Sequence, residues 1–109
     1  MASDLYTGTL DLLILKALQW GPLHGYAICR WIRDRTGDVL SIQEGALYPA
    51  LHRLEARRLL LEHWGESETG REAKFYRLSA AGRRHLKSEI KRWRSYAGVM
   101  GRTLSAARP

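Results

Sequence analysis

The sequence predicts a mainly helical domain with one small β-hairpin, in which three helices precede the hairpin and one helix follows it. Apolar residues recur at helical spacing in four segments, and two short extended segments flank a polar, glycine-containing stretch. The chain has 109 residues, of which 45% are hydrophobic and 27% charged, as expected of one packed globular domain. It contains no repeat or linker-like tract, so we expect a single domain over residues 1–109.

The first helix is expected over residues 9–20 and the second over residues 24–36. Residues 21–22, Gly-Pro, separate them, because proline disfavours helical dihedrals in the residue before it. Leu12 and Leu15 lie beside the main apolar stripe of the first helix, which predicts that this helix also packs against a second surface. The stripe itself consists of Leu10, Leu13, Ile14, Ala17 and Leu18.

The third helix lies within the segment 44–58. Ser41 and Glu44 fit a capping box, while Gly45 makes a later start equally compatible, so the predicted start falls between Ser41 and Gly45. Pro49 removes a hydrogen bond from a helix interior, a loss that is smaller near the first turn. The predicted buried stripe consists of Leu47, Ala50, Leu51 and Leu54, and the predicted outer face includes Tyr48, Pro49, His52 and Arg53.

The extended segments 59–64 and 73–78 predict a hairpin with a polar tip, and Ser79 is expected to cap a last helix over residues 79–97. Residues 98–109 are expected to form a frayed tail. Three apolar residues, Leu86, Ile90 and Trp93, recur on one face of this helix among lysines and arginines.

That apolar stripe predicts an interface between two copies of the chain, because it is narrow for burial against so small a domain. Leu12 and Leu15 would then receive the last helix of the partner. The alternative is that Leu86, Ile90 and Trp93 pack against the first helix of their own chain.

The net charge of +7 and the pI of about 10.1 favour a polyanionic partner, either nucleic acid or an anionic membrane surface. The longest apolar run, residues 12–15, is too short to span a bilayer. The N-terminus lacks the pattern of a signal peptide, so we expect a cytoplasmic protein.

Catalysis, a cofactor and a metal site are not expected. Cys29 stands alone, so no internal disulfide can form and a four-ligand zinc site would need scattered histidines. The sequence has no paired-histidine metal motif, no serine in a strained elbow and no phosphate-binding glycine loop. The histidines, His24, His52, His63 and His85, are dispersed along the chain.

Three helices followed by a hairpin form the order of a winged helix-turn-helix, here residues 7–78, in which the third helix enters the major groove of DNA. His52 and Arg53, with Tyr48 beside them, are groups that reach base edges and phosphates. The alternative is that Tyr48 packs on the wing and Arg53 pairs with an acid. In the wing, Arg71 and Lys74 either grip phosphates or are simply solvated. A winged-helix module that docks proteins or RNA without specific duplex binding is the rival function.

The chain resembles the PadR family of bacterial transcriptional regulators, in its short branch with a single C-terminal dimerisation helix. The resemblance extends from about Thr7 to Trp93 and rests on the runs GTLDLLIL at 8–15, GPLHGY at 21–26, EGALYPALHRLE at 44–55 and AKFYRLSAAG at 73–82. It implies a homodimeric repressor on a palindromic operator in double-stranded DNA, released by an effector or signal. An aromatic effector would stack on Trp93.

By position, the resemblance assigns Tyr48, Pro49, His52 and Arg53 to the DNA-reading face and Lys74 and Tyr76 to the wing. Two residues depart from the family pattern. Ala46 replaces a hydroxyl residue, and Arg58 replaces the glycine that follows the helix. A left-handed conformation at Arg58 would cost roughly 1 kcal/mol, unless the helix ends differently.

Overall fold

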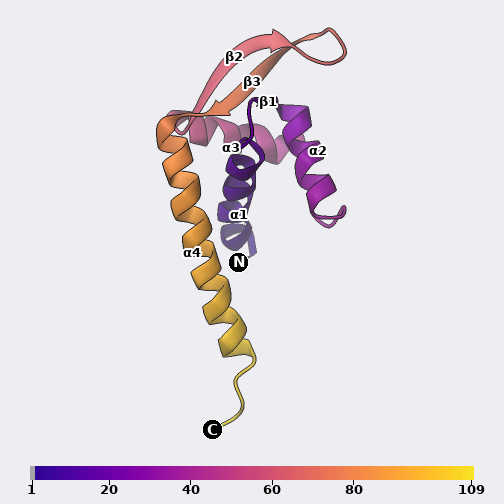
Figure 1. Cartoon of the computed structure of the whole chain (residues 1–109). Coiled ribbons are helices and arrows are strands. Elements are labelled where there is room, and N and C mark those ends of the chain that lie inside the picture. Colours follow the sequence, from indigo (N-terminus) through magenta and orange to yellow (C-terminus); the bar gives the residue numbers. More distant parts are fainter. Residues whose placement is uncertain (1) are drawn as a thin grey trace.

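The computed structural model describes the backbone of residues 2–109 and the side chains of residues 8–109. Its order of elements confirms the predicted fold class of helices, hairpin and final helix (Figure 1). The elements are α1 (Ala2–Ala17), β1 (Leu23–His24), α2 (Gly25–Arg35), α3 (Glu44–Ala56), β2 (Leu60–Glu66), β3 (Glu72–Leu78) and α4 (Ala80–Leu104).

A short strand, β1, extends the predicted hairpin to a three-stranded antiparallel sheet in the order β1-β3-β2. Leu23 pairs with Tyr76, and α2 therefore begins one residue later than predicted. His24 serves as the N-cap of α2, since its Nδ1 accepts a hydrogen bond from the Ala27 amide at 3.2 Å. The sheet and the helix are thus joined through a single residue.

The hydrophobic core lies where α1, α2 and α3 meet beneath the sheet, and the first turns of α4 close it. The predicted stripe of α3 is buried there. Leu15 and Leu86 are 1% and 4% exposed, so they belong to the core of their own chain. The prediction that they face a partner is wrong, because α4 packs on α1 within the chain and both residues lie in the core that this packing helps to close.

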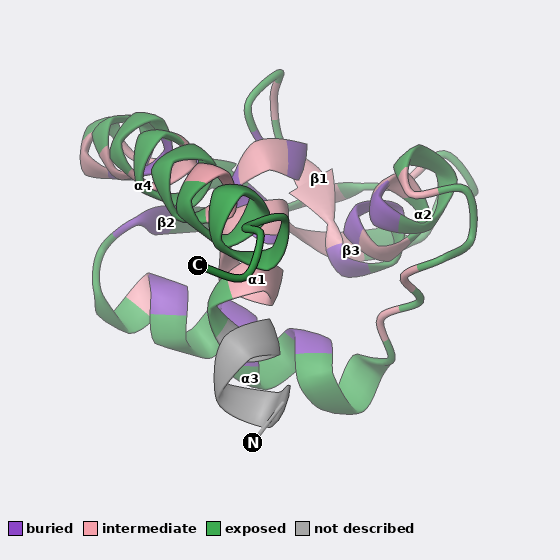
Figure 2. Cartoon of the chain, turned by 90° about the horizontal axis from the view of Figure 1, so that it is seen from below, coloured by how far each residue is buried: buried purple, intermediate pink, exposed green. Residues whose placement is uncertain are grey.

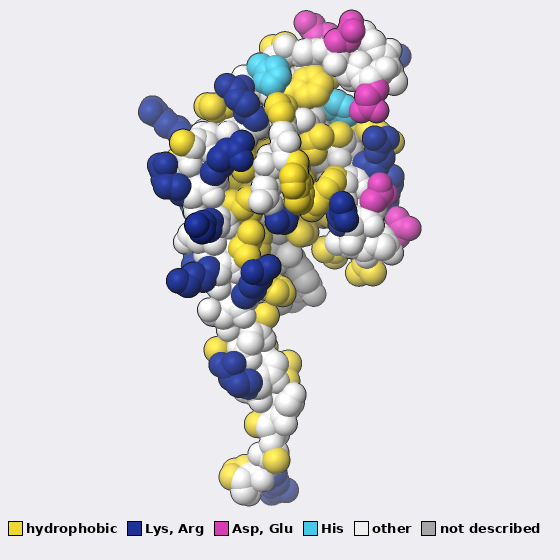
Figure 3. All heavy atoms as spheres, viewed as in Figure 1, with side chains coloured by type: hydrophobic (Ala, Val, Ile, Leu, Met, Phe, Trp, Pro, Cys, Tyr) yellow, Lys and Arg dark blue, Asp and Glu magenta, His cyan; other side chains and the backbone are white. Residues whose placement is uncertain are grey.

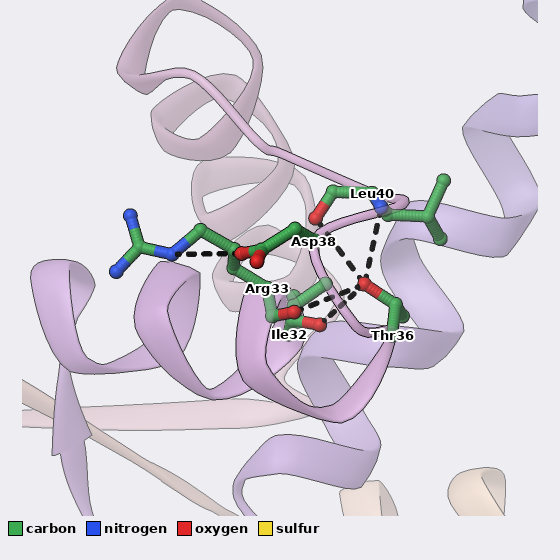
Figure 4. A network of polar contacts seen from close by, with 5 residues as sticks. All are labelled: Ile32, Arg33, Thr36, Asp38 and Leu40. Carbon is green, nitrogen blue, oxygen red and sulfur yellow. Dashed lines mark hydrogen bonds and ion pairs between the residues drawn. The ribbon is translucent and has the colours of Figure 1, made fainter.

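The turn between α2 and α3 is held by Thr36, the C-cap of α2 (Figure 4). Its hydroxyl group donates to the Ile32 carbonyl at 2.8 Å, and the hydroxyl oxygen accepts from the Leu40 amide at 3.1 Å. The Asp38 amide donates to the Arg33 carbonyl at 2.8 Å, and the two side chains lie 3.8 Å apart. These contacts close the C-terminus of α2 and fix the point from which the chain enters α3.

Helix α3 ends in a left-handed residue, Arg58, with φ of 61°. The Leu59 amide donates to the Leu54 carbonyl at 3.0 Å, and the Arg58 amide to the Glu55 carbonyl at 2.8 Å. This pair of bonds is a Schellman motif, in which glycine is the usual left-handed residue. The chain therefore keeps the expected helix end and accepts the strain of arginine there.

Helix α4 starts directly against the end of α3. The Ser79 hydroxyl donates to the Arg58 carbonyl at 2.7 Å and caps α4 by accepting from the Gly82 amide at 2.9 Å. A Cβ atom at Gly82 would overlap the Leu59 carbonyl oxygen, so this approach requires glycine. The end of α3 and the start of α4 are therefore fastened at one junction.

Helix α4 is longer than predicted, because it continues to Leu104 where a frayed tail from residue 98 was expected. Its second half projects beyond the rest of the domain (Figure 1). Side chains of this half are mostly exposed, in contrast to the buried residues near its start (Figure 2).

Candidate nucleic-acid interface

The outer face of α3 is formed by the residues that the sequence predicted. The helix starts at Glu44 with Gln43 as N-cap and no side-chain capping bond, so the capping box is not formed. Pro49 lies in the second turn and leaves the Gly45 carbonyl without a helical donor. The exposed side chains of α3 include Tyr48, Pro49, His52 and Arg53, and we call these four the outer face of α3.

Tyr48 leans from α3 toward α2. A Cβ atom at Gly25, the first residue of α2, would lie 2.9 Å from the Tyr48 hydroxyl oxygen. Gly25 therefore makes room for this hydroxyl, which remains partly open to solvent because the Tyr48 side chain is 40% exposed. The tyrosine packs on the helix-turn-helix and still presents a polar group at the surface.

Arg53 points to the opposite side, toward α1. Its Nη2 donates to the Asp11 carboxylate at 2.8 Å, a charge-assisted hydrogen bond between the two helices. This is the pairing with an acid that was the alternative for Arg53. The guanidinium nevertheless remains on the exposed surface of α3.

Lys74 of the wing is held by two carboxylates. Its ammonium lies 2.6 Å from Glu62 and 3.9 Å from Glu55. The hydrogen bond to Glu62 raises the pKa of Lys74. Burial raises the pKa of Glu55, whereas hydrogen bonds with Glu55 and Lys74 lower the pKa of Glu62. A phosphate approaching Lys74 therefore competes with carboxylates already in place.

Tyr76 does not lie on the surface, although the resemblance placed it in the wing motif. It is 2% exposed, and burial raises its pKa. Its ring supports the Lys74 ammonium, which lies 5.5 Å from the ring centroid. Tyr76 is therefore too buried for the direct contact with DNA that was expected, and it instead supports Lys74 from beneath.

The wing tip, residues 67–71, turns through Gly70 at φ of 80°. Arg71 is exposed and forms no ion pair with the side chains of residues 8–109. Glu68, by contrast, lies 3.9 Å from Arg30 of α2. Arg71 is thus the cation of the tip that is available to an anionic ligand.

A cleft of about 470 Å³ separates the wing from the helix-turn-helix. Sequence patterns assigned no role to Trp64, which lines this cleft and is 64% exposed. Trp64 pairs with Lys74 across the hairpin, so both side chains lie on the same face of the sheet. The hairpin register, once known, places Trp64 beside Lys74 and so identifies it as a residue of this cleft. The lining residues are His24, Gly25, Tyr26, Tyr48, His52, Trp64, Glu72, Ala73, Lys74 and Tyr76.

A helix with an exposed polar face beside a cleft and a β-wing suits duplex DNA, since the helix fits a major groove and the wing reaches the neighbouring backbone. The described side chains include no group of three or more His, Cys, Asp and Glu residues placed to hold a metal ion. Among the described residues, no helix is long and apolar enough to cross a membrane.

Comparison with known proteins identifies one family. The model of the transcriptional regulator PadR-like family matches residues 14–88. An uncharacterised protein of Lysinibacillus sphaericus is 32% identical over 91 residues, which is 84% of each chain. An uncharacterised 37.1 kDa transposon protein of Streptomyces fradiae is 42% identical over 105 residues. That match covers 94% of this chain and 27% of the relative's length.

Solved structures show the same fold. A transcriptional regulator from Clostridium thermocellum superposes with a TM-score of 0.82 at 29% identity, over 91% of this chain and 96% of that one. A PadR family transcriptional regulator from Eggerthella lenta gives 0.81 at 30% identity, over 98% and 91%. One from Clostridium difficile gives 0.77 at 30% identity, over 88% and 98%.

Proposed function

We propose that this chain, which belongs to the PadR-like family of transcriptional regulators, is a sequence-specific double-stranded DNA-binding repressor that acts as a homodimer. The family consists of DNA-binding regulators and not of enzymes. The observation that carries the proposal is the exposed outer face of α3 beside the cleft and wing.

In this proposal the outer face of α3 enters the major groove. His52 and Arg53 are the groups that contact base edges, while Tyr48 and Pro49 pack against the sugar-phosphate backbone and bases. Lys74 and Arg71 contact phosphates from the wing, and the exposed ring of Trp64 lies against the backbone in the cleft. Lys74 leaves the Glu62 carboxylate when it binds a phosphate.

The proposed dimer uses the projecting half of α4. Trp93, Tyr96, Val99 and Met100 are all at least 38% exposed and follow one another along the helix. Together with the partly buried Ile90 and Leu12 they form one apolar surface, which is too long for the rest of the domain to cover. The interface is thereby moved toward the C-terminus, away from Leu15 and Leu86.

An apolar groove of about 380 Å³ between α1 and α4 is the proposed effector site. Leu12, Leu13, Ile90 and Trp93 line it, and Trp93 offers an exposed ring for stacking by a planar aromatic compound. 1-Anilinonaphthalene-8-sulfonate serves as a probe. We expect it to bind the native protein and release the operator, and Trp93→Ala to lose both responses while mass in solution shows that it is still a dimer. A dye response that survives this change would place the site elsewhere.

The DNA-binding proposal is tested by the salt dependence of duplex affinity. About six to ten neutralised phosphates per dimer predict a steep linear fall of log affinity with log salt concentration. A flat response would favour a module that docks proteins, and stronger binding of RNA would favour the RNA-docking alternative.

The dimer is tested by mass in solution. Tyr96→Asp is expected to halve the mass and weaken operator binding. Val39→Asp is the matched control, because Val39 is an exposed apolar residue outside α4. An unchanged mass for Tyr96→Asp would contradict the proposed interface.

A further inference from the structure

The excess positive charge of the chain does not lie on the elements that would read DNA. Residues 1–79 contain ten lysines and arginines and ten acidic residues, so their formal charges cancel. Helix α4 alone carries seven lysines and arginines against one acid, Glu89. The net charge of +7 therefore arises entirely after residue 79.

Six of these cations share one face of α4. At about 100° per residue they fall within an arc of about 100°, and they extend over roughly 28 Å at 1.5 Å per residue. Figure 3 shows Lys and Arg side chains along this helix, down the left side of the molecule. We call this surface the basic ridge. It consists of Arg83, Arg84, Lys87, Lys91, Arg94 and Arg102, all of them exposed.

The charges of the basic ridge are not neutralised within the chain. No ridge residue forms a salt bridge with the side chains of residues 8–109. The Arg83 guanidinium donates to the Gln19 carbonyl at 3.4 Å, and to no carboxylate of residues 8–109. The salt bridge on α4 joins Arg92 to Glu89, and both lie off the ridge. The ridge cations can therefore neutralise phosphates of a polyanion, which releases the counterions condensed on that polyanion.

Neither neighbouring surface covers the ridge. Leu86 and Ile90 face α1, about a quarter turn around the helix from the centre of the ridge. Trp93 and Met100 lie further around the helix in the same direction, and so further from the ridge. A dimer formed through Trp93, Tyr96, Val99 and Met100 leaves most of the ridge open, since Val99, the nearest of the four, lies about 60° from the ridge edge at Arg102. Beyond the junction at Ser79, helix α1 lies between α4 and α3 (Figure 2), so most of the ridge is a surface separate from the outer face of α3.

We propose that the basic ridge binds duplex DNA through its phosphates without reading bases. Its length approaches one turn of B-form DNA, about 34 Å, so it can contact backbone on both sides of a groove. An anionic bilayer fits less well, because insertion needs a free apolar face between the cations. Here that face is buried at Leu86 near the start of α4, and the proposed dimer covers its exposed continuation at Trp93 and Met100. This role goes beyond the reading of an operator by α3 and the wing.

The test compares two variants that each remove three positive charges. Arg84→Gln/Lys87→Gln/Lys91→Gln alters the ridge, and Arg30→Gln/Arg33→Gln/Arg35→Gln is the matched control on exposed positions of α2. Circular dichroism and mass in solution verify that both remain folded and equally assembled. Affinity for a random duplex is then measured between about 50 and 200 mM salt.

The ridge variant is expected to bind the random duplex about tenfold more weakly. Its salt slope should fall by about 2 to 3 per protomer, since each phosphate that the ridge no longer neutralises lowers the slope by roughly 0.9. The α2 variant should keep the native slope. Equal weakening in both variants would show that net charge alone attracts the duplex and would overturn the proposal.

A third variant separates the ridge from the proposed operator site. His52→Ala/Arg53→Ala should lose operator preference, and adding the three ridge changes to it should still weaken random-duplex binding about tenfold. If this variant abolishes random binding while the ridge variant preserves it, the ridge is not a DNA surface. Binding of the native protein and of the ridge variant is also compared on duplex RNA and on phosphatidylcholine vesicles that contain phosphatidylserine. A ridge variant that binds RNA or vesicles more weakly, with DNA binding unchanged, would also overturn the proposal.

Discussion

Arg53 of α3 and Asp11 of α1 are joined by a 2.8 Å hydrogen bond between guanidinium and carboxylate. The bond holds a candidate DNA-reading side chain against the helix that also lines the α1–α4 groove. The bond thereby fixes the direction of the guanidinium before DNA binds, which lowers the entropy that the Arg53 side chain loses on binding.

Arg53→Ala is expected to weaken operator binding by roughly 1 to 3 kcal/mol and to relax base preference at one position. Asp11→Asn should retain the cation but lower the preference for operator over random duplex, because the guanidinium is no longer directed. Titration of both duplexes with each variant provides the measurement. Equal weakening on operator and random duplex for Arg53→Ala would identify it as a phosphate anchor.

Glu62→Gln is expected to raise duplex affinity severalfold, because it frees Lys74 from the carboxylate 2.6 Å away. Glu66→Gln removes the same charge from the same strand without freeing Lys74, and serves as control. Duplex affinities of the two variants are compared at equal salt. If both gain equally, the effect is one of net charge and Lys74 is not a phosphate contact.

Gly82→Ala is expected to destabilise the fold by about 1 to 3 kcal/mol, because the new methyl group meets the Leu59 carbonyl oxygen. Gly101→Ala, in open space on the same helix, should instead stabilise by about 0.5 to 1 kcal/mol. Chemical denaturation measures both. A harmless Gly82→Ala would contradict the tight junction between α3 and α4.

Arg58→Gly is expected to raise the free energy of unfolding by up to about 1 kcal/mol, since glycine adopts φ of 61° without strain. Arg57→Gly should destabilise, because Arg57 has φ of −84° and gains nothing from glycine. The comparison is made by thermal unfolding. The opposite order of stability would show that the Arg58 side chain compensates for its strain.

The sequence predicted the elements whose signal is periodic. The α3 stripe from Leu47 to Leu54 and the hairpin are examples, since each depends on local spacing. Strand β1 was missed because two residues carry no period. Burial of Leu15 and Leu86 was misjudged because periodicity identifies an apolar face but not the neighbour that covers it.

The same limit applies to the candidate site. The exposed face of α3 follows from helical spacing, whereas the contacts of Lys74 depend on hairpin register and on the approach of α3. Asp11 and Arg53 meet across 42 residues of chain, which local patterns do not encode. Composition reveals the net charge but not its confinement to one face of α4.

Selection of bound duplexes from a random pool tests the central proposal most directly. A dimer that reads DNA with two α3 helices should enrich a palindrome whose half-sites lie about one helical turn apart. His52→Ala/Arg53→Ala should lose this enrichment while remaining folded. A native protein that binds the pool without enriching any sequence would contradict sequence-specific reading by α3.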